Sequence, residues 1–538
     1  MPSSPAIRGT YRTDLRARAV YSEGAGIYRI VPAAIARPAG TSDIVQLVRW
    51  AAGSGASLIP RGAGSAMGGG NVGDGVVVDL TGLRHGPVTV DPERRRARAG
   101  AAVTWMELNR TAGSCELRLP PDPSSGRWAT LGGMLSTNAA GARSVRYGSV
   151  RSWVHAAELV TADGQVTRLE RGRPAPAGIL AFERFANVAA PAIGAATALV
   201  GTRFPLTRKN SSGYALDAWL ASGDLLDLLI GAEGTLGIVT AIEWRLDRHP
   251  RASSAIRLSL ASLDVLADVV HALLPFNPSA IELLDRTFLD LVTTQGASAK
   301  ATKGIEAVLL VELEGEDASE LAETTGGVAN AVRPLVLKVE TALAEADARR
   351  LWAIRHAASP ILAALPETRR SLQVIEDGCV PIVRLGEYVR GVRAAAARRG
   401  LDIVLFGHAG DGHVHCNLLP ELARTGWEAE VAALLDEVTE LVVRLGGTPS
   451  GEHGDGRLRA PLLERVFGPE IVGLFRLVKD AFDPHGILNP GIKLGVAPPI
   501  TRLKAGADAA QLPADIAARL RAVEREGGYG VPRLELLD

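Results

Sequence analysis

The chain is 538 residues long, with 47% hydrophobic and 22% charged residues, and its 59 basic residues balance 59 acidic ones. This length exceeds what one hydrophobic core usually supports, so two or three domains are expected. The zero net charge excludes a global field that would attract nucleic acid or an anionic membrane. The three cysteines, Cys115, Cys379 and Cys416, form no CxxC motif, which argues against an iron-sulfur cluster or a disulfide scaffold.

The N-terminus carries arginines but no continuous apolar segment followed by a cleavage site, so residues 1–21 do not predict a secretory signal. No stretch of about twenty residues is long enough and free enough of charge to span a bilayer. We therefore expect a cytoplasmic protein without a transmembrane segment, and peripheral docking onto a membrane-bound partner stays open.

The first structural unit predicted is α/β. Residues 33–36 and 57–60 are short apolar strand candidates, and residues 42–53 have helical spacing behind a Thr-Ser cap. A loop with many glycines, residues 61–70, follows the second strand and leads into a third strand at 75–80. Glycines after a strand expose successive backbone N–H groups, which suits a pyrophosphate.

Two more glycine-rich segments follow, at residues 130–141 and 231–239, the first of them preceded by the proline-rich run 120–125. Surface loops are often rich in glycine, so one such loop is weak evidence. Three hydroxyl-rich, glycine-lined segments in one half of the chain make better sense as the walls of a groove for one long cofactor.

Glycines are sparser between about residues 249 and 400, where helical and strand patterns alternate, as in 258–273 and 306–313; we predict a second domain here. Residues 349–355 predict a helix with Trp352 and Arg355 on one face. On position alone, a solvated charge is the safer interpretation of Arg355. Residues 463–482 are amphipathic and end in a turn at 483–491; the tail from about Val496 has one helical stretch, 515–526.

Two short patches, residues 407–415 and 450–456, contain four of the ten histidines together with Glu452. Two histidines and a glutamate make a divalent-metal site, and a further histidine is left to act as a base. The alternative is a pair of glycine-rich turns whose histidines make structural hydrogen bonds. On strand geometry, His413 and His415 lie two apart and on one face, so this pair is one candidate for the ligands.

In this order the motifs resemble the flavin-dependent oxidoreductases of the vanillyl-alcohol oxidase (PCMH) type, most closely the branch of D-lactate and D-2-hydroxyglutarate dehydrogenases and the glycolate oxidase flavin subunit. The resemblance spans roughly residues 18–494 and includes 489–493. It implies an α+β fold: a PCMH-type FAD-binding domain of two α+β subdomains, and a cap domain whose antiparallel sheet is covered by helices. The domains expected are an N-terminal arm (1–31), the FAD-binding domain (32–248), the substrate or cap domain (249–445), a C-terminal segment returning to the flavin (446–495) and the tail (496–538).

The resemblance also implies roles for single residues. His408, His415 and Glu452 match the metal ligands, His453 the catalytic base, and Arg355 the group that holds the substrate carboxylate. His413 stands where this branch often has asparagine. Segment 376–381 lacks the lysine that the 2-hydroxyglutarate enzymes carry just before it, which puts a second substrate carboxylate in doubt.

FAD is the cofactor implied, with a divalent metal, Zn or Mn-like, beside it. The first loop has no histidine or cysteine to form a covalent flavin bond, so we expect noncovalent FAD. The residues matched to FAD contacts are Arg61, Gly62, Ala63, Gly64, Ser65, Pro121, Asp122, Thr130, Gly133, Ser136, Asn138, Gly141, Glu233, Gly237, Ile238, Val239 and Asn489.

The function implied is metal-assisted oxidation of a small D-2-hydroxy acid, such as lactate, glycolate or 2-hydroxyglutarate, to the 2-oxo acid. The chain ends without an iron-sulfur domain, so we expect a separate electron acceptor: an iron-sulfur subunit, an electron-transfer flavoprotein, a quinone or oxygen. The alternatives are a non-catalytic flavin subunit that relays electrons and a transferase resembling alkylglycerone-phosphate synthase. A homodimer is one of the oligomeric states left open.

Overall fold

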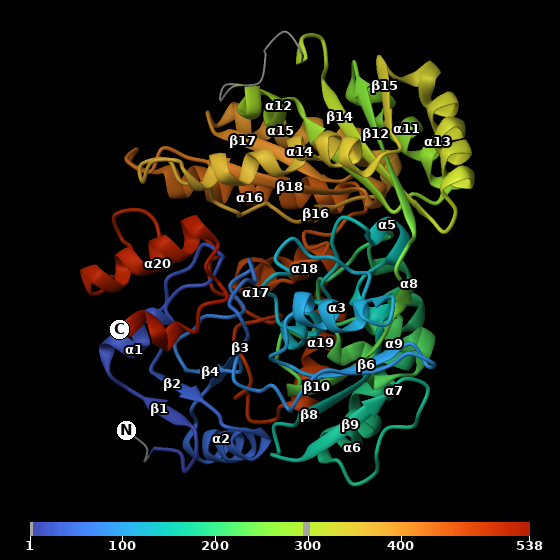
Figure 1. The fold of residues 1–538 in the computed structure, drawn as a ribbon. Helices are drawn as coiled ribbons and strands as arrows, with labels where there is room; N and C mark the ends of the chain where they lie inside the picture. Colours follow the sequence, from blue (N-terminus) through green and yellow to red (C-terminus); the bar gives the residue numbers. More distant parts are fainter. Residues whose placement is uncertain (1–3, 294–301) are drawn as a thin grey trace.

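The computed structural model describes residues 4–293 and 302–538. It has two halves, one above the other in Figure 1. The lower half contains the chain up to residue 248, the returning helices α17–α19 and the tail, whereas a seven-stranded sheet and its helices form the upper half. The chain is thus a mixture of helices and separate sheets, as the α+β expectation requires.

The first sheet of the lower half is small and mostly parallel. Its strand order is β1-β2-β4-β3, with β4 pairing in parallel with both β2 and β3. The predicted strands at 33–36, 57–60 and 75–80 and the helix at 42–53 are each found within one residue or so of their predicted bounds. The elements are β1 (Thr10–Arg12), α1 (Leu15–Val20), β2 (Ala34–Arg37), α2 (Thr41–Ser54), β3 (Leu58–Arg61) and β4 (Val76–Asp79).

The predicted Thr-Ser cap of α2 is wrong. The N-cap residue is Gly40, which makes no side-chain cap bond. Instead, the carboxylate of Asp43 in the first turn accepts hydrogen bonds of 2.8 Å from the backbone N–H groups of Gly9 and Ala39. These bonds tie the first turn of α2 to the N-terminal arm and to the preceding chain, while the start of the helix has no side-chain cap.

The second sheet of the lower half is antiparallel, with strand order β5-β6-β10-β8-β9. Its apolar core is completed from the far end of the chain, because Phe475 and Phe482 pack against Phe204 and Phe185. The strands are β5 (Thr89–Asp91), β6 (Arg96–Gly100), β8 (Val154–Val160), β9 (Val166–Glu170) and β10 (Ile238–Arg245), with the separate pair β7 (Leu117–Arg118) and β11 (Asp247–Arg248).

Several short helices surround this second sheet. The amphipathic stretch at 463–482 is two helices, because Gly468 and Pro469 interrupt it. The helices are α3 (Trp105–Gly113), α4 (Leu131–Thr137), α5 (Ser144–Tyr147), α6 (Leu180–Arg184), α7 (Ala190–Ala195), α8 (Thr197–Arg203), α9 (Leu216–Ser222), α10 (Leu225–Leu229), α17 (Gly456–Arg459), α18 (Leu463–Phe467) and α19 (Pro469–Phe482).

The upper half is built on the antiparallel sheet β15-β12-β14-β13-β17-β18-β16. The segment 306–313, one of the alternating patterns, forms β14, and the segment 258–273 holds the end of β12 and then α11. The predicted helix at 349–355 lies within α14. The strands are β12 (Ala252–Leu260), β13 (Ala280–Asp285), β14 (Ala307–Gly315), β15 (Lys338–Ala342), β16 (Gly378–Cys379), β17 (Asp402–His408) and β18 (His413–Leu419).

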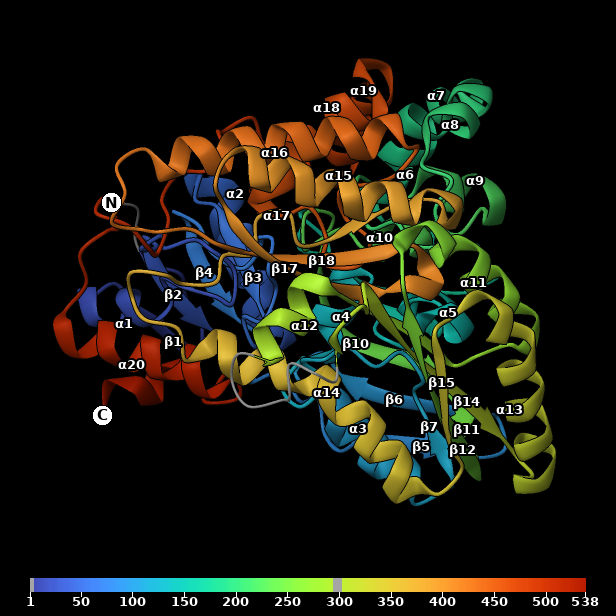
Figure 2. The ribbon, with the colours of Figure 1, turned by 90° about the horizontal axis from the view of Figure 1, so that it is seen from above.

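Helices cover both faces of this sheet (Figure 2). Four of them share the main apolar core with one face, and α12 and α14 pack with a smaller cluster on the other. The helices are α11 (Leu266–Leu273), α12 (Arg286–Thr293), α13 (Ala318–Val332), α14 (Glu345–Ala363), α15 (Leu385–Arg398) and α16 (Trp427–Arg444). Within the described ranges no single helix is long and apolar enough to cross a membrane, although the bent pair Leu180–Ala195 and Thr197–Arg203 passes on length and composition.

Ion pairs join the two halves. Arg143 of the lower half lies 2.6 Å from Asp122 in the same half and 2.7 Å from Glu312 on β14, while Arg118 lies 2.7 Å from Glu314. All five side chains are at least two-thirds buried, so these contacts fix the upper sheet over the glycine-rich loops.

Candidate active site

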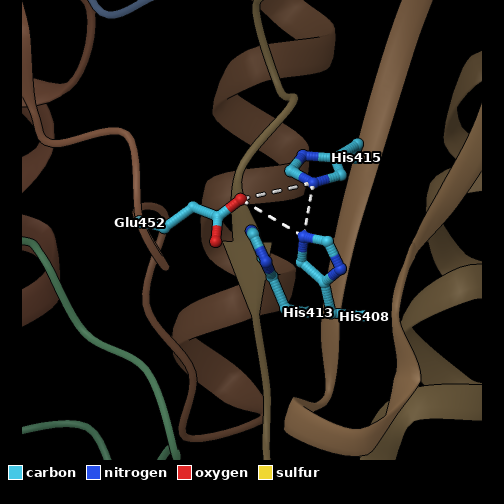
Figure 3. A group of neighbouring side chains, drawn as sticks. All are labelled: His408, His413, His415 and Glu452. Carbon is cyan, nitrogen blue, oxygen red and sulfur yellow. Dashed lines mark hydrogen bonds and ion pairs between the residues drawn. The ribbon is translucent and has the colours of Figure 1, made fainter. Parts of the chain in front are cut away.

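One hairpin of the upper sheet brings two histidines together. β17 ends at His408, and a tight turn leads into β18, where His415 is registered against Phe406. Glu452 reaches the same point from the loop after α16 (Figure 3). Nε2 of His408 lies 3.2 Å from Nε2 of His415 and 3.3 Å from Oε1 of Glu452, and His415 Nε2 lies 3.6 Å from that oxygen.

The second ring nitrogen of each histidine, Nδ1, also has a hydrogen-bond partner. Nδ1 of His408 lies 2.5 Å from a carboxylate oxygen of Glu282 on β13, and Nδ1 of His415 donates to the main-chain oxygen of Glu376 at 2.8 Å. Such partners fix the orientation and tautomer of each imidazole. Both Nε2 atoms therefore face the carboxylate of Glu452.

The pKa values in this group are strongly shifted. Burial disfavours the charged form of His408, but the carboxylates of Glu282 and Glu452 outweigh it and raise its pKa to about 9. Burial and the neighbouring histidine rings lower the pKa of His415 well below its ordinary value. Although burial acts the other way, Lys209 and His408 hold the pKa of Glu452 well below its usual range. A cation bound here would displace the proton of His408.

This donor set fits a divalent metal. A tetrahedral ion with ligands at about 2.1 Å holds its ligand atoms about 3.4 Å apart. The three separations among His408, His415 and Glu452 are 3.2, 3.3 and 3.6 Å. Two imidazoles and one carboxylate are also the ligands of catalytic zinc sites that keep a fourth position open. These three residues would hold the ion.

His413 is the fourth residue of the group but is engaged elsewhere. Its Nε2 lies 2.9 Å from Oδ1 of Asp377, its Nδ1 lies 3.5 Å from Nζ of Lys209, and its side chain has no exposed surface. In Figure 3 no interaction joins it to the three residues around the common point. Both nitrogens of His413 thus have partners other than the atoms that face that point.

His453 lies beside the group and borders the cavity described below. Its ring stacks on that of His415 with centroids 5.3 Å apart, and Nδ1 contacts a carboxylate oxygen of Glu376. The other oxygen of Glu376 contacts the guanidinium of Arg459. Burial opposes the imidazolium, but Glu376 and Asp377 outweigh it and raise the pKa of His453 to about 10. The side chain is 28% exposed, more than those of the three convergent residues.

Arg355 is tied to the same group through one carboxylate. Its Nε donates to Glu282 at 2.8 Å, and the other oxygen of Glu282 contacts His408. The guanidinium also stacks over Phe406, 4.6 Å from the ring centroid. Trp352, one turn earlier on α14, lines the same cavity. The solvated-charge alternative for Arg355 is wrong, because its side chain is 15% exposed and ion-paired.

One cavity of about 1280 Å³ connects this group with the glycine-rich loops. The proposed metal ligands and their neighbours line this cavity: His408, His415, Glu452, His453 and Arg355. The residues matched to FAD that also line it are Arg61, Gly62, Ala63, Gly64, Ser65, Asp122, Thr130, Gly133, Ser136, Gly141, Glu233, Gly237, Ile238 and Val239.

Three residues matched to FAD do not line the cavity. Asn138 ends α4 in the left-handed conformation, with φ of 54°, and Pro121 is buried. The side-chain nitrogen of Asn489 donates to the carbonyls of Gly70 and Glu233, at 2.9 and 2.8 Å. Asn138 and Asn489 thus shape the loops around the cavity.

The volume of the cavity and the buried positive charge of Arg61 beside it both suit FAD. This volume exceeds the roughly 300–1,000 Å³ of common ligand sites. The buried guanidinium of Arg61 donates to the carbonyls of Tyr21, Glu23 and Asn71, and burial lowers its pKa to about 9. A diphosphate beside the loop would offset the buried positive charge.

Sequence reasoning missed three residues that organise the site. Lys209 lies 2.8 Å from Glu452, Glu282 joins His408 to Arg355, and Asp377 accepts hydrogen bonds from the backbone N–H groups of Glu452 and His453. Nothing in the apolar sequence around Glu282 marks it as a site residue. Asp377 lies in the acidic 376–381 segment, and Lys209 is one of the chain's few lysines, in a run of polar residues.

Comparison with known proteins agrees with this architecture. An FAD binding domain model matches residues 32–170, and a model of the C-terminal domain of FAD linked oxidases matches residues 249–492. A D-lactate dehydrogenase of Archaeoglobus fulgidus is 30% identical over 462 residues, which cover 85% of this chain and 90% of that protein. Glycolate oxidase subunit GlcD of Bacillus subtilis is 29% identical, covering 88% and 92%. The chain therefore belongs to the FAD-linked oxidase family and is a flavin-dependent oxidoreductase.

More distant relatives extend the comparison. A D-2-hydroxyglutarate dehydrogenase of Escherichia coli is 26% identical over 90% of this chain and 50% of its own length. The solved structure of p-cresol methylhydroxylase has a TM-score of 0.66 at 15% identity, covering 90% of this chain and 94% of that one. An alkyldihydroxyacetonephosphate synthase has a TM-score of 0.58 at 14% identity, covering 89% and 82%. At such identities the structures show the shared PCMH-type fold and nothing of the chemistry.

Proposed function

We propose that this protein oxidises a small D-2-hydroxy acid to the 2-oxo acid with FAD as the electron sink and a divalent cation at His408, His415 and Glu452. The observation that carries the proposal is the bridge made by Glu282, which joins Arg355 to His408 within the cavity that the FAD loops line. A carboxylate-binding arginine and a set of metal ligands are thereby held side by side. The names of the relatives supply the substrate class.

The side chains divide the work between binding and proton transfer. When bound, FAD accepts the hydride from C2 and the cation acidifies the substrate hydroxyl. Arg355 binds the carboxylate with its planar guanidinium, which fixes the orientation of the acid. His453 takes the hydroxyl proton at Nε2, because its Nδ1 is held by Glu376.

The electrostatics of His453 couple its role to the metal site. Glu376 and Asp377 raise its pKa to about 10, so the ring is protonated at neutral pH when no cation is near. Oε1 of Glu452 lies 3.6 Å from Nε2 of His453. Positive charge at the ligand atoms would oppose the imidazolium and lower the pKa of His453, which favours the neutral ring that can accept a proton.

The identity of the acid and of the electron acceptor completes the proposal. We infer a monocarboxylate such as lactate or glycolate, since the lysine expected for a second carboxylate is missing before Glu376. Electrons leave for a separate acceptor of the cytoplasm or the membrane surface: an iron-sulfur subunit, an electron-transfer flavoprotein, a quinone or oxygen.

The test is anaerobic mixing of the purified protein with a panel of D- and L-2-hydroxy acids, before and after treatment with a chelator. We expect bleaching of the flavin absorbance by one D-acid and loss of that bleaching after chelation. Bleaching that survives complete metal removal would contradict the metal role. Bound FAD that no acid reduces would contradict the oxidation of 2-hydroxy acids and favour an electron-relay subunit.

A further inference from the structure

The tail, residues 496–538, lies beyond the segment that matches the family model, which ends at residue 492. It runs back along the side of the molecule and ends beside the first sheet (Figure 1). Leu503 pairs with Tyr28, and the helix α20 (Ala514–Glu526) and a 3-10 helix at Arg533–Leu537 follow. Nothing in the catalytic proposal uses this segment.

Apolar contacts anchor the tail to the lower half. Ile516 and Leu520 of α20 are at most 3% exposed and share one cluster with Tyr21 of the N-terminal arm, Ile59 of β3 and Val77 of β4. The tail therefore covers one face of the first sheet, and its removal would expose that face to water.

Charged contacts anchor the tail to the upper half. Glu524 contacts Arg370, which lies between α14 and β16, and it also lies 3.0 Å from Lys504 and from Arg521. The side chains of Arg370 and Lys504 are 9% and 3% exposed, and that of Glu524 is 23% exposed. Arg521 adds a contact of 2.6 Å to Glu367. Glu524 thus joins three cations from the tail and the upper half, and Glu367 adds contacts to Arg521 and Arg525 of the tail.

The side of the tail that faces inward lines the active-site cavity. The tail residues that border the same cavity as the FAD loops include Arg521, Glu524, Arg525, Gly527 and Tyr529.

An aromatic contact lies where the tail borders the cavity. The ring of Tyr529 lies 6.3 Å from that of Trp128, which also lines the cavity, and the guanidinium of Arg533 lies 5.7 Å from the Tyr529 ring. Gly527 has φ of 65°, and a Cβ there would lie 3.2 Å from Trp128. The chain therefore passes directly over Trp128.

We propose that the tail is a strap that forms part of the FAD site and slows release of the cofactor. Its apolar side is fixed to the first sheet, Glu524 fixes it to the upper half, and the segment between closes the cavity beside the FAD loops. The inference depends on FAD occupying the cavity and is independent of the substrate proposed above.

The experiment measures FAD release from the full-length holoprotein. Free flavin is more fluorescent than flavin held in a protein, so release is followed as a rise in fluorescence after dilution. Glu524→Gln removes the carboxylate that Arg370, Lys504 and Arg521 share, and Tyr529→Ala removes the ring against Trp128 without altering charge. We expect release to accelerate roughly ten-fold in each, equivalent to about 1.4 kcal/mol.

Asp515→Asn is the matched control. Asp515 lies on the same helix and pairs with Arg16, but both side chains are nearly half exposed and neither lines the cavity. We expect its release rate to equal that of the unaltered protein. Equal rates in all four proteins, or the same acceleration in the control, would overturn the strap. If Glu524→Gln fails to fold, Tyr529→Ala decides alone. Unaltered protein that binds no FAD would instead overturn the FAD site itself.

Discussion

Two buried clusters of charged residues lie between the halves of this molecule. They differ in the groups that surround the carboxylate at the centre of each. In the first, two imidazole nitrogens and a Glu452 oxygen point at one another at 3.2 to 3.6 Å. In the second, the carboxylate of Glu524 is already surrounded by three cations. His408, whose pKa is about 9, carries a proton that a bound cation would replace, whereas the carboxylate of Glu524 already has its partners within the chain. The first cluster is therefore arranged to bind an ion and the second to act as a latch.

The largest effect is expected from removing one convergent histidine. His415→Ala should abolish tight metal binding and lower the rate of flavin reduction by about a thousand-fold or more, since the cation would lose a ligand. His413→Asn is the comparison, because His413 is bound by Asp377 and Lys209. Metal content per protein, measured by elemental analysis, should fall only in His415→Ala. Metal loss in His413→Asn alone would restore His413 as a ligand.

The next effect separates proton transfer from cofactor binding. His453→Asn should slow flavin reduction by roughly a hundred- to ten-thousand-fold, since the imidazole proposed to take the hydroxyl proton is lost. FAD and metal content should be unchanged, because the residue belongs to neither set of contacts. Flavin reduction at the normal rate in this variant would remove His453 from the mechanism.

The third prediction concerns how much the buried ammonium of Lys209 contributes to the stability of the metal-free protein. Lys209→Met removes the buried ammonium that pairs with Glu452 and Asp411, which should lower the free energy of unfolding by about 3 kcal/mol in the metal-free protein. Arg208→Met is the control, because Arg208 also pairs with Asp411 but is 46% exposed. Denaturant unfolding of both variants measures the difference. Equal, small losses would show that Lys209 carries no special weight.

The latch should respond to acid. Burial opposes ionisation of Glu524, but Lys504 and Arg370 lower its pKa from 4.5 to about 2. Its contribution to stability is therefore complete above pH 4.5 and is lost as the pH falls toward 2. The difference in unfolding free energy between the unaltered protein and Glu524→Gln should be about 3 kcal/mol at neutral pH and should shrink below pH 4.5. A difference that does not change between pH 6 and pH 3 would contradict the latch.

Local patterns predicted much of the first cluster and little of the second. The strands and helix of the first sheet were predicted nearly residue by residue, because apolar runs and glycine breaks are local signals. His408, His415 and Glu452 stand in short glycine-rich patches that resemble known motifs, and a hairpin joins the two histidines. The helix at 515–526 was predicted, but its partner Arg370 lies more than 140 residues away, and no local pattern encodes such a contact.

The same limit explains the residues behind the site. Glu282 contacts His408 from a strand 126 positions earlier, and Lys209 reaches Glu452 across 243 positions. Each looks like an ordinary charged residue until the fold buries it. The wrong prediction at the start of α2 has the same origin, since Asp43 in the first turn contacts Gly9, 34 positions earlier, and the helix has no side-chain cap.

The most direct test of the central claim is the rate of flavin reduction by a D-2-hydroxy acid as metal is returned to chelated holoprotein. Our account predicts no reduction without metal and full recovery when one divalent ion is bound per chain, with no recovery in His415→Ala. Reduction at an undiminished rate in metal-free protein would contradict it.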